Sequence, residues 1–227
     1  MAVKAVLFDL DGTLVEFKID YENMKKEVFK FLVENGVPKE LIGRRLSKTI
    51  NRVLEWRGYS DEAFKLVEEA FKIMERFELE AAEKVEVKEG VEEILEELER
   101  DGLKIVIVTN NGSKGAYKTL RESGLIRFVD RVYTRDYLKI MKPNSKLMRL
   151  ILEELKLNPS EVILVGDSSI DVEAASVIGV PAIMISSSEE KRRELEEAGA
   201  KIILDDIREL PRVIEKIGGM SERGIKE

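Results

Sequence analysis

Two aspartates separated by one residue are the first chemically suggestive feature of the sequence. Asp9 and Asp11 directly follow an apolar run, and Gly12 comes next. In extended backbone, residues two apart point to the same side, so both carboxylates face one point. Carboxylates this close repel each other, so one must be protonated or a cation must lie nearby. The alternative interpretation is a strand-to-loop turn in which the aspartate side chains bond to nearby backbone groups.

A second pair of aspartates follows another apolar run. Asp167 comes after residues 162–165, and Asp171 lies four residues further along. The two share a face if the turn between them is helical. A helix cap with a first-turn carboxylate, favoured by the helix dipole, also explains Asp171 but explains Asp167 less well.

Hydroxyl, amide and ammonium groups occur at two further places. Thr109, Asn110 and Asn111 follow an apolar run at an expected helix start, where backbone N–H groups suit a phosphate or another oxyanion. The same residues can equally serve as turn and cap residues. Lys142 precedes Pro143, which suits the first turn of the next helix and would hold the lysine beside the sheet edge. Taken alone, a lysine is usually a solvated surface group.

The composition narrows the chemistry. The 227 residues contain no histidine, cysteine or glutamine, which excludes Ser-His-Asp triads, thiolate nucleophiles and His or Cys metal sites. A metal here must be a hard ion held by oxygen. The net charge of -7 argues against a nucleic-acid partner. The 34 Glu, set against only 11 Asp, together with abundant Lys and Arg, are typical of a thermophile protein.

The elements that must position these groups alternate along the chain. Short apolar runs typical of buried parallel strands occur at 4–10, 104–108, 162–165, 181–185 and 201–204. Helical periodicity lies between them, and the last helix is expected to end before Gly218, with 218–227 fraying. This alternation predicts an α/β fold with a doubly wound, Rossmann-like parallel sheet. The polar groups would then meet at the carboxyl edge of the sheet.

One long segment interrupts the alternation. Apolar stripes at helical spacing occupy residues 24–32, 42–53 and 64–77, with no strand pattern among them. We therefore expect an α/β core over 1–16 and 85–227, with a helical domain over 17–84 inserted after the first strand. No apolar stretch reaches the roughly 18 residues of a membrane span, and the short run before Asp9 does not suit a signal peptide. A cytoplasmic monomer or homodimer is the expectation.

Together these residues resemble the motifs of the haloacid dehalogenase superfamily. The four motifs occur here in the family's order, as Asp9-x-Asp11-x-Thr13, Thr109, Lys142 and Gly166-Asp167-Ser168-Ser169-x-Asp171. They span almost the whole core, and the helical segment resembles the family's C1 cap. The resemblance implies a HAD-type phosphoric monoester hydrolase acting on a small phosphorylated metabolite, with phosphoglycolate as the first candidate.

The resemblance also implies roles for the acidic residues. Asp9 would be the nucleophile that forms an aspartyl-phosphate, and Asp11 would be the general acid and base. Mg²⁺ would be held by the carboxylates of Asp9 and Asp167 and by the backbone carbonyl of Asp11. These roles are physically consistent, because a dianionic phosphate approaches several carboxylates only when a cation is interposed.

On the phosphate side, the resemblance assigns binding to Thr109 and Asn110 and charge neutralisation to Lys142. The residues expected to support them are Thr13, Ser168 and Asp171. The sequence departs from the family habit just after Lys142, where Pro143-Asn144-Ser145-Lys146 replaces the usual Pro-x-Pro followed by an acid.

Several alternatives share these features. A phosphoglucomutase-like phosphotransferase would share every core residue, whereas haloalkanoate dehalogenases do not need Asp11. A phosphonate-cleaving relative would need a cap lysine, and receiver domains lack an inserted bundle. From a different class, a non-enzymatic metal-binding scaffold could dock a partner on the helical segment.

Cationic residues around Trp56 could contact a substrate carboxylate or sugar, although a solvated charged face is favoured. They are Arg44, Arg45, Arg52 and Arg57.

Overall fold

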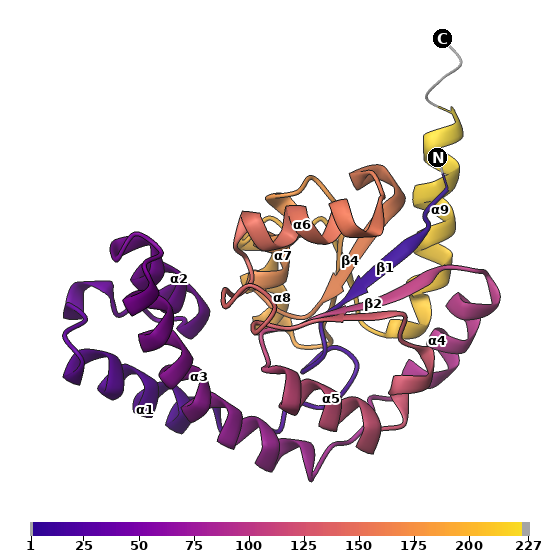
Figure 1. The fold of residues 1–227 in the computed structure, drawn as a ribbon. Coiled ribbons are helices and arrows are strands. Elements are labelled where there is room, and N and C mark those ends of the chain that lie inside the picture. Colours follow the sequence, from indigo (N-terminus) through magenta and orange to yellow (C-terminus); the bar gives the residue numbers. More distant parts are fainter. Residues whose placement is uncertain (1, 224–227) are drawn as a thin grey trace.

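A fully parallel sheet forms the centre of the molecule. The computed structural model describes the backbone of residues 2–223 and the side chains of residues 2–218 (Figure 1). Six strands pair in the order β3-β2-β1-β4-β5-β6, so β1 lies between β2 and β4. The strands are β1 (Ala5–Phe8), β2 (Lys104–Val108), β3 (Arg131–Tyr133), β4 (Val162–Gly166), β5 (Ala182–Ile185) and β6 (Ile202–Leu204). All five pairings are parallel, which confirms the predicted sheet.

Helices cover both faces of this sheet, which explains why its strands read as nearly continuous apolar runs. Val6 and Phe8 pack with helices on one face, and Ala5 and Leu7 pack with helices on the other. The first face is covered by α4 (Val91–Arg100), α5 (Ser113–Glu122) and α9 (Leu210–Arg223). The second is covered by α6 (Ser145–Leu155) and α7 (Ser169–Ser176). A small third cluster, around Leu195, holds α8 (Glu189–Glu197) against the sheet margin.

The chain between β1 and β2 forms a helical insertion, here meaning helices α1 to α3 and their connections. These helices are α1 (Tyr21–Glu34), α2 (Leu46–Trp56) and α3 (Asp61–Ala82), with a 3₁₀ turn at Lys39–Leu41. The side chain of Asp20 caps α1, and that of Ser60 caps α3. Figure 1 shows α1 and α2 to one side of the sheet, while α3 runs back to lie along α5. The apolar stripes of the insertion join the core cluster of the α6 and α7 face.

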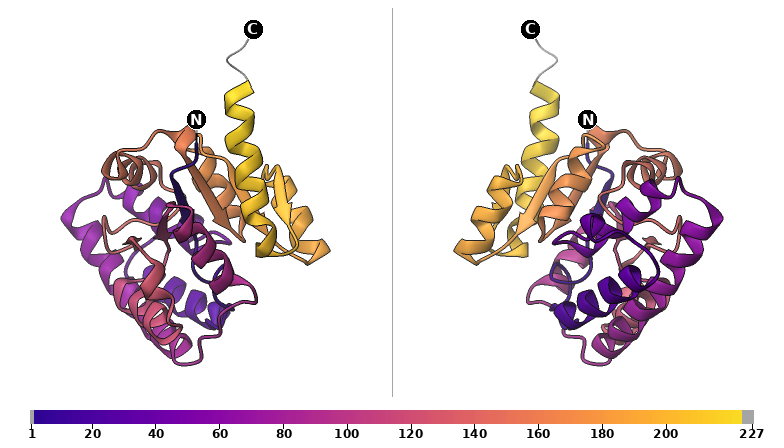
Figure 2. Two further views of the ribbon diagram at one scale, coloured as in Figure 1. Left: turned by 90° about the vertical axis from the view of Figure 1, so that its right-hand side faces the viewer. Right: turned by 90° about the vertical axis from the view of Figure 1, so that its left-hand side faces the viewer.

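Helix α9 lies at the end of the molecule opposite to helices α1 and α2. Helix α9 stands on the side away from α1 and α2 in all three views, close to the start of β1 (Figure 2). The predicted end of this helix before Gly218 is wrong, because α9 continues to Arg223. Gly218 has no positive φ, and a glycine inside a helix costs only about 1 kcal/mol. Residues 224–227 of the expected frayed tail lie outside the described residues.

The start of α6 also differs from expectation. The predicted place of Pro143 in the first helical turn is wrong, because Asn144 caps the helix and Ser145 begins it. The side chain of Asn144 accepts a hydrogen bond from the N–H of Lys146 at 2.9 Å, which places the helix start beyond the proline. The peptide bond between Lys142 and Pro143 is cis. Within the described residues, every helix is too short or too polar to cross a membrane.

Candidate active site

The polar residues predicted from different strand ends meet around one cavity. A hollow of about 250 Å³ lies at the carboxyl ends of β1, β2 and β4, between the sheet and the helical insertion. Its core-side lining contains most of the predicted site residues. They are Asp9, Asp11, Thr109, Asn110, Lys142, Asp167, Ser168 and Asp171. The remaining predicted residue, Thr13, donates a hydrogen bond from Oγ1 to Oδ1 of Asp167 at 3.3 Å.

Lys142 is the central cation of this group. Its side chain is almost fully buried, and Nζ donates to Oδ1 of Asp9 at 2.6 Å and to Oδ1 of Asp171 at 2.7 Å. Burial alone would lower the pKa of Lys142, but the carboxylates of Asp171 and Asp9 raise it above the ordinary value for lysine. The ammonium therefore stays charged and ties the end of β1 to the start of α7.

The carboxyls carry more negative charge than this lysine can neutralise. Burial raises the pKa of Asp9 well above its ordinary value against the opposing effect of Lys142, and Asp171 and Asp167 raise it further. The pKa of Asp11 is raised to about 7, mainly by burial and then by the nearby carboxylate of Glu78. A hydrogen bond from Nδ2 of Asn111 to Oδ2 of Asp11 at 2.6 Å acts in the opposite direction.

The same carboxyls fit a hard divalent cation. One oxygen from each of Asp9, Asp167 and Asp171 lies within 4.8 Å of the others. The Asp171 carboxylate is only 1% exposed, and it accepts from Lys142 at Oδ1 and from Oγ of Ser168 at Oδ2 at 2.6 Å, whereas the side chains of Asp9 and Asp167 are 13% and 11% exposed. Burial also raises the pKa of Asp167, so this group too would gain from a cation. Asp9 and Asp167 are therefore the better placed ligands, and oxygen donors of this kind suit Mg²⁺.

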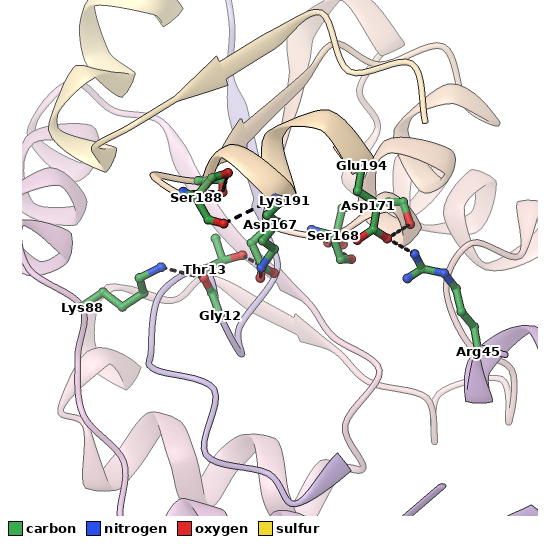
Figure 3. Close-up of polar contacts among 12 residues, drawn as sticks. Gly12, Thr13, Arg45, Lys88, Asp167, Ser168, Asp171, Ser188, Lys191 and Glu194 are labelled. Atoms are coloured by element: carbon green, nitrogen blue, oxygen red, sulfur yellow. Dashed lines mark hydrogen bonds and ion pairs between the residues drawn. The ribbon is translucent and has the colours of Figure 1, made fainter. Parts of the chain in front are cut away.

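Two features hold the loop after β1 against Asp167. Gly12 has φ of +87°, and a Cβ at this position would collide with the Asp167 carboxylate. Nζ of Lys88 donates to the carbonyl of Gly12 at 2.8 Å, and Lys191 of α8 forms an ion pair with Asp167 (Figure 3). The glycine therefore permits a close approach that no other residue would allow.

Asn110 and Thr109 have structural partners in addition to their place on the cavity wall. Oδ1 of Asn110 accepts from the N–H of Lys142 at 2.7 Å, and Nδ2 donates to its carbonyl at 3.4 Å. The amide of Asn110 thus holds the backbone of Lys142 next to the end of β2. Oγ1 of Thr109 accepts from the N–H of Asn111 at 3.1 Å and orders the start of the loop.

A buried ion pair that the sequence reasoning missed lies beneath this loop. Glu78 of α3 and Arg135 have side chains only 1% exposed and are bonded by two guanidinium nitrogens. Oε2 of Glu78 also accepts from the N–H of Gly112 at 3.0 Å, and Nη1 of Arg135 donates to the carbonyl of Asn110 at 2.9 Å. The pair thereby connects the insertion to the loop after β2, in which Asn111 donates its hydrogen bond to Asp11. One available signal was that Glu78 falls four residues after Met74, on the buried stripe of its helix.

The insertion supplies the opposite wall of the cavity, and that wall is mainly carbon. It consists of Phe17, Ile19, Tyr21, Met24, Leu46 and Met74, with Arg45, Ser47 and Glu78. Of the four arginines considered above, Arg45 is the one among the lining residues, and it pairs with Glu194 of α8 (Figure 3). Trp56 is 47% exposed, with the guanidinium of Arg57 over its ring, and it is not among the residues that line the cavity.

Known proteins resemble this chain in sequence and in fold. A family model described as haloacid dehalogenase-like hydrolase matches residues 6–185. A protein named phosphoglycolate phosphatase from Pseudomonas savastanoi is 28% identical over 218 residues, covering 91% of this chain and 78% of its own length. A protein named pyrophosphatase PpaX from Bacillus mycoides is 29% identical over 224 residues, covering 96% and 100%. A solved HAD family hydrolase from Deinococcus radiodurans, with bound phosphate and sodium, has a TM-score of 0.63 at 22% identity, covering 95% of this chain and 96% of that chain.

Proposed function

Since the chain belongs to the haloacid dehalogenase-like hydrolases, we propose that it is a Mg²⁺-dependent phosphatase that cleaves small phosphate monoesters through an aspartyl-phosphate on Asp9. The observation that carries this proposal is the contact of Lys142 with Asp9, with Asp11 beside them in one cavity. A carboxylate attacks phosphorus only when surrounding positive charge screens its repulsion from the phosphoryl oxygens.

Two displacements complete the reaction. In the first, a carboxylate oxygen of Asp9 bonds to phosphorus, the ester P–O bond breaks, and Asp11 gives its proton to the leaving oxygen. In the second, Asp11 takes a proton from water, the water oxygen bonds to phosphorus, and the bond to Asp9 breaks to release phosphate. The pKa of Asp11, raised to about 7 by burial, supports both roles because the carboxyl can give and take a proton near neutral pH.

The neighbouring residues position the phosphoryl group. The ammonium of Lys142 lies where it can balance the charge of Asp9 and of the transferring group. Thr109, at the end of β2, contributes a hydroxyl to the same wall. A Mg²⁺ held by Asp9, Asp167 and the carbonyl of Asp11 would supply further positive charge for the phosphoryl oxygens.

The proposal assigns residues 17–84 to a cap that encloses the substrate. Cap residues from Phe17 to Glu78 line the cavity, and the Arg45–Glu194 and Lys48–Glu173 ion pairs join α2 and the loop before it to α8 and α7. The named relatives act on different compounds, one being called a phosphoglycolate phosphatase and another a pyrophosphatase. Their names therefore support phosphate chemistry but do not identify the leaving group, which we infer below from the cavity.

Hydrolysis of a generic aryl phosphate with and without Mg²⁺ tests the proposal. We expect turnover that depends on Mg²⁺ and falls by more than about 10⁴-fold in Asp9→Asn, as for the loss of a nucleophile. Asp101→Asn, on an exposed residue at the end of α4, is the matched control and should retain full activity. Mass spectrometry of rapidly quenched enzyme should find phosphate on the peptide containing Asp9. Full turnover by Asp9→Asn, or no Mg²⁺-dependent turnover of any ester, would overturn it.

A further inference from the structure

The wall that faces the phosphate-binding end of the cavity has the character of a binding surface for hydrocarbon. Met24, Leu46 and Met74 contribute nearly buried side chains from α1, α2 and α3, while Ile19 and Phe17 continue the surface toward the opening. Ile170 of α7 and Met141 add apolar contacts from the core. An uncharged apolar group would gain by leaving water for such a surface, whereas a hydrated ion would lose its solvation there.

The cavity volume suits a group of about the size of one ring. About 250 Å³ is available for the whole substrate. A cavity of roughly 150 Å³ accommodates benzene, so the remaining volume is of the order needed for one phosphoryl group. A phosphate ester of a single ring or a short branched chain fits this space.

The charges near the cavity disfavour a second anionic group on the substrate. Lys142 is paired with Asp9 and Asp171, and Lys191 is paired with Asp167. Arg45, on the insertion side, is paired with Glu194 (Figure 3). A substrate carboxylate would have to take Arg45 from this partner and would leave the carboxylate of Glu194 without its guanidinium. An uncharged leaving group leaves all of these ion pairs intact.

From these observations we infer that the preferred substrate is a phosphate monoester of a compact, uncharged and largely apolar alcohol, about the size of one aromatic ring. This inference rests on the proposed phosphatase function and adds the identity of the leaving group. If the substrate is of this kind, the Arg45–Glu194 pair holds the insertion against α8 and does not bind substrate. A compact substrate with a second anionic group, such as the carboxylate of phosphoglycolate, should be a poor one.

A comparison of benzyl phosphate with phosphoglycolate tests the inference, because both are esters of primary alcohols and differ mainly in charge and apolar surface. With Mg²⁺ present, kcat/KM for benzyl phosphate should exceed that for phosphoglycolate by about tenfold to a hundredfold, as expected for burying one ring. Glycerol phosphate, whose alcohol is uncharged but polar, should fall between them. Higher kcat/KM for phosphoglycolate would overturn the inference and leave the proposed phosphatase function standing. No hydrolysis of any of the three would overturn the proposed function and this inference with it.

Two leucines of α2 provide a matched pair of variants. Leu46 and Leu54 are 1% and 0% exposed, but only Leu46 is among the residues that line the cavity. Leu46→Ala should lower kcat/KM for benzyl phosphate about tenfold more than it lowers kcat/KM for phosphoglycolate. Leu54→Ala should change both by the same factor, which accounts for any general loosening of the insertion. Equal effects of the two variants on benzyl phosphate would refute the inference.

Arg45→Met tests whether this arginine only holds the insertion against α8 or also binds an anionic group of the substrate. If Arg45 only holds the insertion against α8, the variant should alter kcat/KM for benzyl phosphate and phosphoglycolate by the same factor. Glu194→Gln should likewise alter kcat/KM for the two substrates by one factor. A selective loss of phosphoglycolate turnover in Arg45→Met would show that the arginine binds a substrate anion, and the inference would then be wrong.

Discussion

Replacing Asp11 by asparagine should stabilise the folded protein while it removes acid–base catalysis. Burial, followed by the neighbouring Glu78, raises the pKa of Asp11 from 3.8 to about 7. The difference of about 3 pH units corresponds to about 4 kcal/mol, at about 1.4 kcal/mol per unit. Since Asp11 is only half-buried and solvent at the cavity opening screens its charge, we expect about half of this, or ~2 kcal/mol. In a protein of this size the gain should raise Tm by about 4–8 °C.

The gain should depend on pH in a defined direction. Because the pKa of Asp11 is higher in the folded protein than in the unfolded chain, the folded state is disfavoured once the carboxyl ionises. The contribution of this group to stability is fully present below pH 4 and is lost as the pH rises through 7. Asp11→Asn removes that loss, so the difference in stability between variant and wild type should be larger at pH 8 than at pH 5.

Urea unfolding of the metal-free protein in EDTA, at pH 5 and at pH 8, measures this difference. Asp101→Asn serves as the control because this aspartate is exposed at the end of α4. Hydrolysis by Asp11→Asn should fall by about 10²–10⁴-fold, the usual contribution of a general acid or base. A variant that is less stable than wild type at pH 8, or equally stabilised at both pH values, would refute the account of Asp11 as a carboxyl held in an unfavourable site.

Three further substitutions test the architecture of the site. Lys142→Met leaves buried carboxylates without their cation and should destabilise the protein by about 3–5 kcal/mol in urea, and unchanged stability would contradict the pairing. Gly12→Ala places a methyl group against Asp167 and should weaken Mg²⁺ binding at least tenfold by calorimetry, whereas unaltered affinity would argue against Asp167 as a ligand. Arg135→Met leaves Glu78 buried and unpaired and should lower the unfolding free energy by about 3–5 kcal/mol, a loss that Glu78→Gln in the same chain should partly reverse.

The parts of the fold that were predictable are those whose signal is local. A strand buried on both faces must be apolar along its whole length, so β1, β2 and β4 are visible as continuous runs. Because parallel strands place their carboxyl ends at one edge, residues that follow these runs meet without further information about the fold. This is why Asp9, Thr109 and Asp167 could be grouped from the sequence.

The elements that the sequence did not reveal lack such a signal. Strand β3 has only three residues, Arg131–Tyr133, and only Tyr133 is buried. Helix α8 has a single buried apolar residue, Leu195, and its other eight residues are all charged. A helix with one apolar contact shows no periodic stripe, so its position depends on contacts such as those of Arg192 with the end of β6. Lys191, which pairs with Asp167, could not be placed for the same reason.

The buried Glu78–Arg135 pair shows where sequence reasoning about the site has to stop. Its two members are 57 residues apart, one on the insertion and one after β3, and both types are common on the surface of this highly charged chain. What brings them together is the length of α3, which runs from the insertion back along α5 and carries Glu78 to the loop after β2. The positions of Asp9 and Asp167 are therefore set by the topology of the sheet, while the pKa of Asp11 is partly set by Glu78 from outside the sheet. An insertion with the same apolar stripes but a different exit angle for α3 would preserve the position of Asp9 and change the pKa of Asp11.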